Sequence, residues 1–399
     1  MAKLHEPLKR LITHLRRRNK FVARADRYSD AFLAESDKDF IRSFLRGLRK
    51  AGIKPDRAVQ EYLLGVYEDM HDSTRGEEPI SNFSERKCRL VNIDQTVLRE
   101  IYNAFLHTGA FLEALNVREA LLEHCVKSSN KANWVRHDLD QGLWRKARAT
   151  LSLREKDDSG NTARFLDRLL DIAPSRNDIP FNDFIKDRPV VILGPGRASK
   201  PTIDDISHFD IAVQINAYGS QQIENTNSAY IRRDIVYYNS LQHEHVKRAI
   251  ETGILDQNWT VFKSEKMKEV FNRKLKCRSC IRPEDIFPFG QFNMLPLILF
   301  DLLQFQPSSI SCINFDLYLG GYRSNYMHPT NASFTRSEHI RTSMIVHDPF
   351  QQLHFLQSVK KVCALTGDRQ FRRVLEMSDE QYADELQASI PGPANQDFS

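Results

Sequence analysis

A glycine-rich turn, GPGRAS at residues 194–199, directly follows the apolar run at residues 189–193. Glycine permits a tight turn and lets backbone N–H groups approach a phosphate. The turn therefore predicts an anion site, with a nucleotide as the first candidate and a plain turn as the alternative. A dinucleotide would require a third glycine and an acidic residue after the next strand, but Ser199 and Asn216 occupy these positions. Pro201 after Lys200 excludes the phosphate loop of ATPases.

His347 is a candidate for acid–base chemistry. It directly precedes Asp348 and Pro349, which are typical of the N-cap and first turn of a helix. Imidazole titrates near neutral pH and can accept the proton of a hydroxyl group. We predict that His347 is a general base and that His354 is structural. A capping or core role for His347 is the alternative, because the chain contains 13 histidines.

These groups need a scaffold, and the chain after residue 188 predicts one. Strands are expected at 189–194, 209–216, 234–240, 259–264 and 308–316, and helices at 264–275, 292–305 and 348–367, the last ending at Gly367. Alternating strands and helices predict an α/β fold with a mostly parallel sheet. Ligands of such sheets bind beyond the carboxyl ends of the strands.

The first half of the chain has a different pattern, which is helical from Ser36 to about Ala173. Asp37 is expected to open one helix, and Asp94 to cap two amphipathic helices that Gly109 divides. We predict an all-α accessory domain at 1–180, an α/β domain at 181–370, and a C-terminal helix with a flexible tail at 371–399.

Composition limits the class of protein. The chain of 399 residues is 41% hydrophobic and 27% charged, and it has neither a secretory signal nor an apolar run long enough to span a bilayer. We expect a cytoplasmic protein with reduced thiols. A net charge of +5 is too small to predict a nucleic-acid partner. The basic, amphipathic first twenty residues could lie on the inner membrane or form a solvated first helix.

The order of six segments in the second half is informative: VVILGPGRAS, FDIAVQINAY, DIVYYNS, GQFNMLPLILFDLL, SISCINFDLY and SMIVHDPFQQLHFLQSVKK. Over residues 187–365, this order resembles the sialyltransferases, the CMP-sialic-acid-dependent enzymes of glycosyltransferase families 42 and 29. The resemblance implies a Rossmann-like, mostly parallel sheet of the sialyltransferase-like GT-A variant. It also implies a CMP-sugar donor, a glycan or glycolipid acceptor, and inverting transfer without a metal or other cofactor.

The resemblance implies roles for individual residues. The donor site would comprise Gly194, Gly196 and Ser199 at the phosphate and ribose, Asn216 at the nucleotide phosphate, Tyr238 and Asn239 on the same site, and Gly290 at the cytidine. His347 would be the base that deprotonates the acceptor.

The leaving phosphate needs a hydrogen-bond donor as charge develops on it. Family 42 places tyrosines after the strand that here ends at 308–316, and family 29 places a histidine upstream of the base. This chain has Tyr318, Tyr322 and Tyr326, and also His328, which lies 19 positions before His347. We predict His328 as the donor, assisted by Tyr322 or Tyr326, with Tyr318 in the sugar-nucleotide site. Asp316 is expected to shape the end of the strand or contact the acceptor.

A metal site is not predicted. The Asp138–Asp140 pair lies in the helical half, and no Asp-x-Asp sequence follows the strands of the α/β half. Cys277 and Cys280 form a lone C-x-x-C, which we interpret as two ordinary thiols. Candidates for pairing with the donor carboxylate are Arg197, Lys200, Arg232, Arg233 and Lys263.

Alternatives remain open for the function. The donor sugar could be sialic acid or Kdo, and a bacterial enzyme of capsule or lipopolysaccharide assembly would fit either. A CMP-Kdo-specific transferase is the first alternative. An ATP-dependent, pterin diphosphokinase-like enzyme and a non-enzymatic helical adaptor are alternatives of other classes.

Overall fold

A computed structural model describes residues 37–74, 90, 93–127, 138, 178–196, 200–216, 228–239, 243–253, 255, 258–272, 275–280, 291–320, 340–341, 343–344 and 346–390. The chain divides into two compact units. The helical unit combines Met1–Ser129, Ser333–Val346 and Ser378–Ser399, and the sheet unit combines Asn130–Ala332 and His347–Met377. In the described part of the chain, no helix is both long and apolar enough to cross a membrane.

In its described part, the helical unit contains two helical pairs and a further helix from the C-terminal segment. Its described helices are α3 (Asp37–Lys50), α4 (Arg57–Thr74), α6 (Gln95–Thr108), α7 (Phe111–Lys127) and α18 (Asp379–Ser389). The predicted turn between α6 and α7 is confirmed: Asp94 accepts a bond from the N–H of Thr96, and Gly109 has φ 84°. α3 packs on α4, and α7 packs on both α6 and α18.

The sheet unit is built on seven parallel strands. They are β1 (Pro189–Leu193), β2 (Ile211–Ile215), β3 (Ile235–Tyr238), β4 (Trp259–Phe262), β5 (Cys277–Ser279), β6 (Ser309–Ile313) and β7 (Leu365–Gly367), in the order β5-β4-β3-β2-β1-β6-β7. The predicted parallel α/β sheet is confirmed, and each of the five predicted strands forms. Sequence reasoning missed β5 and β7, each of which has only three residues.

The described helices of this unit are α11 (Ile179–Ile185), α12 (His243–Glu251), α13 (Glu265–Phe271), α14 (Met294–Leu303), α16 (Pro349–Val362) and α17 (Arg369–Leu375). Short 3-10 turns occur at η3 (Asp204–Ile206) and η5 (Ala229–Ile231). The predicted segment 371–399 therefore begins inside α17 and continues into α18.

The end of α16 differs from the prediction. The helix stops at Val362 instead of Gly367, because Cys363 has an extended backbone (φ −141°, ψ 165°) and the next residues pair with β6 as β7. Gly367 belongs to that strand, where an added Cβ would lie 2.5 Å from the carbonyl oxygen of Cys312. This glycine permits a close approach of two backbones and is not a helix cap.

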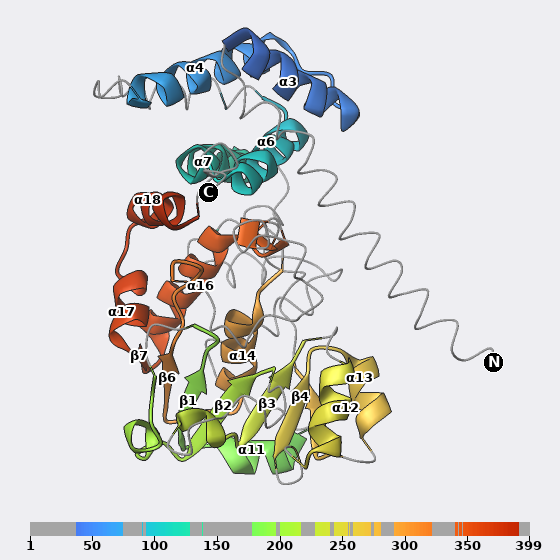
Figure 1. Ribbon diagram of the computed structural model, residues 1–399, viewed down its shortest axis with the longest axis vertical. Coiled ribbons are helices and arrows are strands. Elements are labelled where there is room, and N and C mark those ends of the chain that lie inside the picture. The colour runs from blue at the N-terminus through green and yellow to red at the C-terminus, as the bar shows by residue number, and fades with distance from the viewer. Residues whose placement is uncertain are drawn as a thin grey trace, which may run out of the picture. The chain divides into compact units, whose positions relative to one another are not determined.

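Alternate residues of the strands bury their side chains on opposite faces of the sheet. On one face, Val236 and Tyr238 of β3 pack with Val246 of α12 and with Phe271 of α13. On the other face, the hydroxyl of Tyr237 donates to Asp301 of α14 at 2.7 Å. Helices therefore cover both faces, as in other parallel sheets (Figure 1).

A buried ion pair lies on this second face. The side chains of Arg278 on β5 and Asp301 on α14 are 3% and 0% exposed, and they bond to each other. The guanidinium group of Arg278 also lies 4.6 Å and 4.8 Å from the ring centres of Phe181 and Phe305. A buried charge is stable only with such compensation. The pair thus ties β5 and α14 together.

Candidate active site

The carboxyl ends of the seven parallel strands lie along one edge of the sheet (Figure 1). From β1 the chain continues to β2 on one side, and after β5 it returns to β6 on the other side of β1. In open parallel sheets, ligands bind outside the carboxyl ends of the strands at such a switch point. The segments that follow β1 and β6 are therefore the expected walls of a ligand site.

The glycine-rich turn after β1 packs directly on the end of β6. The N–H of Gly194 donates to Ile313 at 2.8 Å, and the N–H of Gly196 donates to Asn314 at 3.0 Å. A Cβ on Gly196 would lie 2.5 Å from the carbonyl oxygen of Asn314, and one on Gly194 would be closer still. Strand packing therefore accounts for both glycines, and their N–H groups are already bonded within the protein.

A polar bridge joins these two segments. The hydroxyl of Tyr230 donates to the carbonyl oxygen of Gly194 at 2.8 Å and accepts from Nδ2 of Asn314 at 2.9 Å. Asn314 has φ 62°, a conformation that asparagine tolerates, and its N–H donates to Oδ2 of Asp368 at 2.7 Å. The other oxygen of Asp368 caps α17. Sequence reasoning missed these three residues, although an Asn after a strand and an Asp before a helix were the available signals.

Asn216 and Asn239, both predicted for the donor site, lie together at the ends of β2 and β3. Oδ1 of Asn216 accepts from the N–H of Asn239 at 3.1 Å, and the N–H of Asn216 donates to Tyr237 at 2.8 Å. Asn216 is buried and has φ 49°. The bonds of its Oδ1 and N–H explain how Asn216 joins two strand ends.

Tyr238, predicted to face the same site, has its side chain in the hydrophobic core. It is fully buried with Val246, Phe262 and Phe271, and this burial raises the pKa of its phenol group. The alternation along β3 accounts for this position, because Tyr238 and Val236 lie on the same face.

The loop after β6 is organised by Asp316. Its Oδ1 accepts from the N–H of Tyr318 at 3.1 Å, and its Oδ2 accepts from the N–H of Gly320 at 2.9 Å. These bonds hold Leu317 and Tyr318 at positive φ values of 46° and 81°. Two roles were predicted for Asp316, shaping the end of the strand and contacting the acceptor. The bonds of both carboxylate oxygens to the loop backbone fit the first role.

His347 is held at both its ring and its backbone. Its Nδ1 is 2.9 Å from the carbonyl oxygen of Gln291, and its own carbonyl oxygen accepts from Nε2 of Gln352 at 2.9 Å. Asp348 is the N-cap of α16, as predicted, and accepts from the N–H of Gln351. Nδ1 must carry the proton in its bond to a carbonyl group, so the lone pair of the neutral ring is on Nε2. This tautomer is the one required of a base acting through Nε2.

Three parts of the sheet unit contact the segment Gln291–Asn293, which precedes α14. His347 contacts its first residue, Nζ of Lys263 donates to the carbonyl oxygen of its second at 3.4 Å, and the amide of its third donates to the hydroxyl of Tyr318 at 3.3 Å. Lys263 directly follows β4 and is buried. The segment therefore connects the carboxyl edge of the sheet with the start of α16.

Several predicted site residues lie outside the described residues: Ser199, Gly290, Tyr322, Tyr326 and His328, with Arg197 among the basic candidates.

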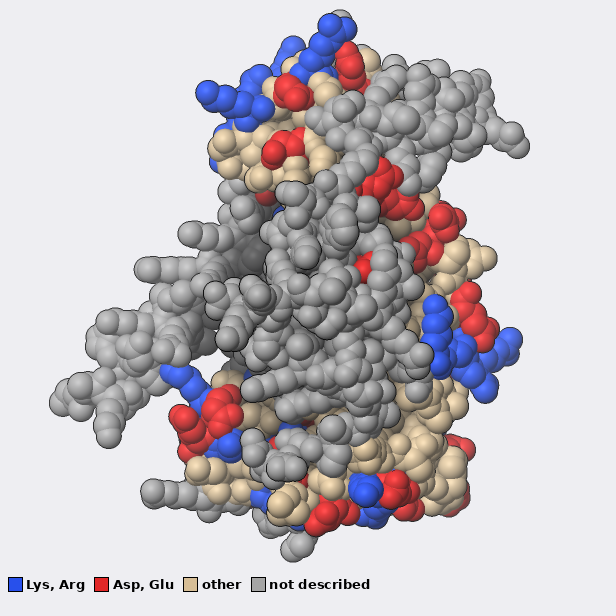
Figure 2. Space-filling model, turned by 180° about the vertical axis from the view of Figure 1, so that it is seen from behind, with Lys and Arg blue, Asp and Glu red and all other residues tan. Residues whose placement is uncertain are grey.

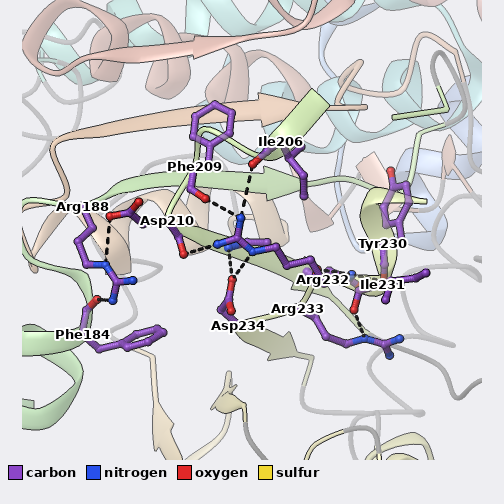
Figure 3. Close-up of polar contacts among 12 residues, drawn as sticks. Phe184, Arg188, Ile206, Phe209, Asp210, Tyr230, Ile231, Arg232, Arg233 and Asp234 are labelled. Atoms are coloured by element: carbon purple, nitrogen blue, oxygen red, sulfur yellow. Dashed lines mark hydrogen bonds and ion pairs between the residues drawn. The ribbon is translucent and has the colours of Figure 1, made fainter. Parts of the chain in front are cut away.

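Arg232, a candidate for binding the donor carboxylate, lies elsewhere. It bonds to Asp234 at 3.1 Å and to the carbonyl oxygen of Phe209 at 2.6 Å (Figure 3). Phe209 precedes β2, and Asp234 precedes β3, so Arg232 is at the amino ends of these strands. The structure therefore places Arg232 at the edge opposite to the candidate site.

In the described part of the chain, no group of three or more His, Cys, Asp or Glu residues is arranged to hold a metal ion. Comparisons of this chain with protein-family models, with curated proteins and with solved structures find no match.

Proposed function

We propose that the protein is an inverting, metal-independent glycosyltransferase. It would move a sialic acid or Kdo-type sugar from a CMP-sugar donor to a hydroxyl group of a glycan or glycolipid. The sheet would be the sialyltransferase-like variant of a Rossmann-like fold. The observation that carries this proposal is the setting of His347, whose ring and backbone are both fixed and whose lone pair is on Nε2.

In the proposed reaction, Nε2 of His347 takes the proton of the acceptor hydroxyl. The acceptor oxygen forms a bond to the anomeric carbon while the bond from that carbon to the phosphate oxygen breaks. CMP leaves with the electron pair, and this single displacement inverts the anomeric centre. His328, with Tyr322 or Tyr326, is the proposed hydrogen-bond donor to the leaving phosphate.

The proposal assigns the glycine-rich turn a supporting role. Because the N–H groups of Gly194 and Gly196 are bonded to Ile313 of β6 and to Asn314 directly after it, we propose that side chains hold the donor phosphate and carboxylate. Lys200, which is exposed after the turn, and Lys263, which follows β4, are the basic candidates on this edge. Asn239 and Tyr318 are the polar candidates.

The test is an assay of donor turnover. The purified full-length protein is incubated with CMP-Neu5Ac, CMP-Kdo or ATP, with EDTA or with magnesium, and the release of CMP or ADP is followed. Slow hydrolysis of the donor counts as turnover, because no acceptor is identified. CMP release that persists in EDTA supports the proposal, and the preferred donor distinguishes sialic acid from Kdo.

The histidine variants show whether turnover belongs to this site. His347→Ala is expected to abolish CMP release, whereas His208→Ala should leave it unchanged. His208 is a matched control because it is exposed before β2, at the opposite edge of the sheet. Magnesium-dependent turnover of ATP would favour the diphosphokinase-like alternative. Absence of turnover with every donor would favour the adaptor and contradict the proposal.

A further inference from the structure

From Arg42 onward, the exposed side chains of α3 carry charge of a single sign. From Arg42 to Lys50, every side chain that the structure leaves exposed on this helix is basic: Arg42, Arg46, Arg49 and Lys50. The opposite face buries Phe40, Phe44, Leu45 and Leu48 in the helical unit. Figure 2 shows basic side chains, with acidic ones among them, over this part of the molecule.

Among the described residues, one of these four basic side chains has an acidic partner. Arg42 pairs with Asp39 at 3.3 Å, and both side chains are well exposed. Among the residues that the structure describes, Arg46, Arg49 and Lys50 bond to no carboxylate. Their spacing instead produces like-charge neighbours, since Arg46 is four residues from both Arg42 and Lys50, and such pairs destabilise a helix. A helix face exposed only to water usually carries charges of both signs.

We propose that this basic face of α3 docks the protein on an anionic lipid surface. The four side chains recur at 42, 46, 49 and 50, so they lie along one side of the helix and can contact a flat surface together. Electrostatic attraction to anionic headgroups is how basic helix faces bind membranes. This inference is independent of the proposed enzymatic activity.

A lipid surface fits these residues better than a nucleic acid. The exposed stripe offers charge but no asparagine, glutamine or aromatic side chain, which nucleic-acid surfaces use to contact sugars and bases. The sequence before α3 adds further lysine and arginine residues, together with Leu4, Leu8, Leu11 and Leu15 at helical spacing. This pattern is suited to a membrane interface.

Vesicle binding tests the proposal. The full-length protein is sedimented with vesicles of phosphatidylcholine alone or with a third of the lipid replaced by phosphatidylglycerol. We expect binding only to the anionic vesicles, and weaker binding as salt is added. Each basic side chain near an anionic surface contributes roughly a fivefold gain in partitioning. The triple variant Arg46→Gln, Arg49→Gln, Lys50→Gln should therefore bind about a hundredfold more weakly.

A matched variant controls for net charge. Lys361→Gln, Arg369→Gln, Arg372→Gln also removes two arginines and one lysine, all exposed on helices of the sheet unit. It should retain binding within a few-fold of the unaltered protein. Equal loss in both variants, equal binding to neutral vesicles, or no vesicle binding at all would overturn the proposal. Tight binding of duplex DNA that the α3 variant alone loses would overturn it in favour of a nucleic-acid partner.

Discussion

Nδ1 of His347 and the carbonyl oxygen of Gln291 are 2.9 Å apart, in a bond that joins the start of α16 to the segment before α14. Gln352, one turn into α16, donates from the same Nε2 to the carbonyl oxygens of His347 and Asp348, at 2.9 Å and 3.2 Å. Its Oε1 has no hydrogen-bond partner among the described residues. The side chain of Gln352 thus holds the backbone of His347 in place at the start of α16.

Replacement of Gln352 by Met should reduce donor turnover by roughly tenfold, because a base that is slightly displaced loses its alignment with the acceptor hydroxyl. KM for the donor should change little. Gln357→Met is the control, since the side chain of Gln357 on the same helix donates to the carbonyl oxygen of Met377 at 3.0 Å, far along the sequence from His347. Equal activity of the two variants would contradict a positioning role for Gln352.

Gly196→Ala is expected to lower the free energy of unfolding by about 1–3 kcal/mol, because its Cβ would overlap the backbone of Asn314. Gly65→Ala should instead raise it by about 0.5–1 kcal/mol, since Gly65 is inside α4 and a Cβ there meets nothing within 4 Å. Chemical denaturation followed by circular dichroism measures both values. If both variants raised the free energy of unfolding, or both lowered it by the same amount, the packing role of Gly196 would be refuted.

Asp301→Ala removes the carboxylate that compensates Arg278 and accepts from Tyr237. It should lower the free energy of unfolding toward the lower end of about 3–5 kcal/mol, because the buried guanidinium loses its fully buried partner but keeps the partly exposed Asp178, at 2.8 Å from Nε. Tyr237→Phe removes one hydrogen bond and should cost only about 1 kcal/mol. Denaturant titration of the two variants gives the comparison. A smaller loss for Asp301→Ala than for Tyr237→Phe would show that the ion pair adds no stability.

Stability should fall in alkaline solution because of the buried tyrosines. Burial raises the pKa of Tyr238 above its ordinary value of 10.0, so the folded protein keeps a proton that the unfolded chain releases. The stability that the buried, protonated Tyr238 contributes is fully present below pH 10 and decreases as the pH rises above 10. Tyr238→Phe should reduce the slope of stability against pH in this range, as measured by thermal denaturation at a series of pH values. An unchanged slope would be evidence that the buried Tyr238 does not cause the loss of stability in alkaline solution.

Five of the seven strands and most of the described helices were predictable because their patterns are local. The runs at β1, β2, β3, β4 and β6 are apolar and flanked by turn residues, and the caps at Asp94 and Asp348 belong to the helices they begin. β5 and β7 were not predictable, because three residues carry no periodicity and their pairing with β4 and β6 is a long-range event.

The candidate site was predictable in outline only. The resemblance implied roles for Asn216 and Asn239, and the helix-start residues after His347, with the chemistry of imidazole, indicated His347. The bonds from Tyr230 to Asn314 and from Gln352 to His347 depend on how elements meet in space, so no local pattern reveals them. For the same reason, the sequence did not reveal the role of Gly194 and Gly196. Their N–H groups bond to Ile313 and Asn314, which are more than a hundred residues away in sequence.

The packing of α18 on α7 affects how the protein is made. α7 ends at Lys127, but its partner begins at Asp379, more than two hundred residues later. During synthesis on the ribosome, every strand of the sheet is translated before α18 appears. The face of α7 that receives α18 must therefore wait for residues 379–389 to be translated, and a nascent chain truncated before residue 379 would lack the helix that packs there.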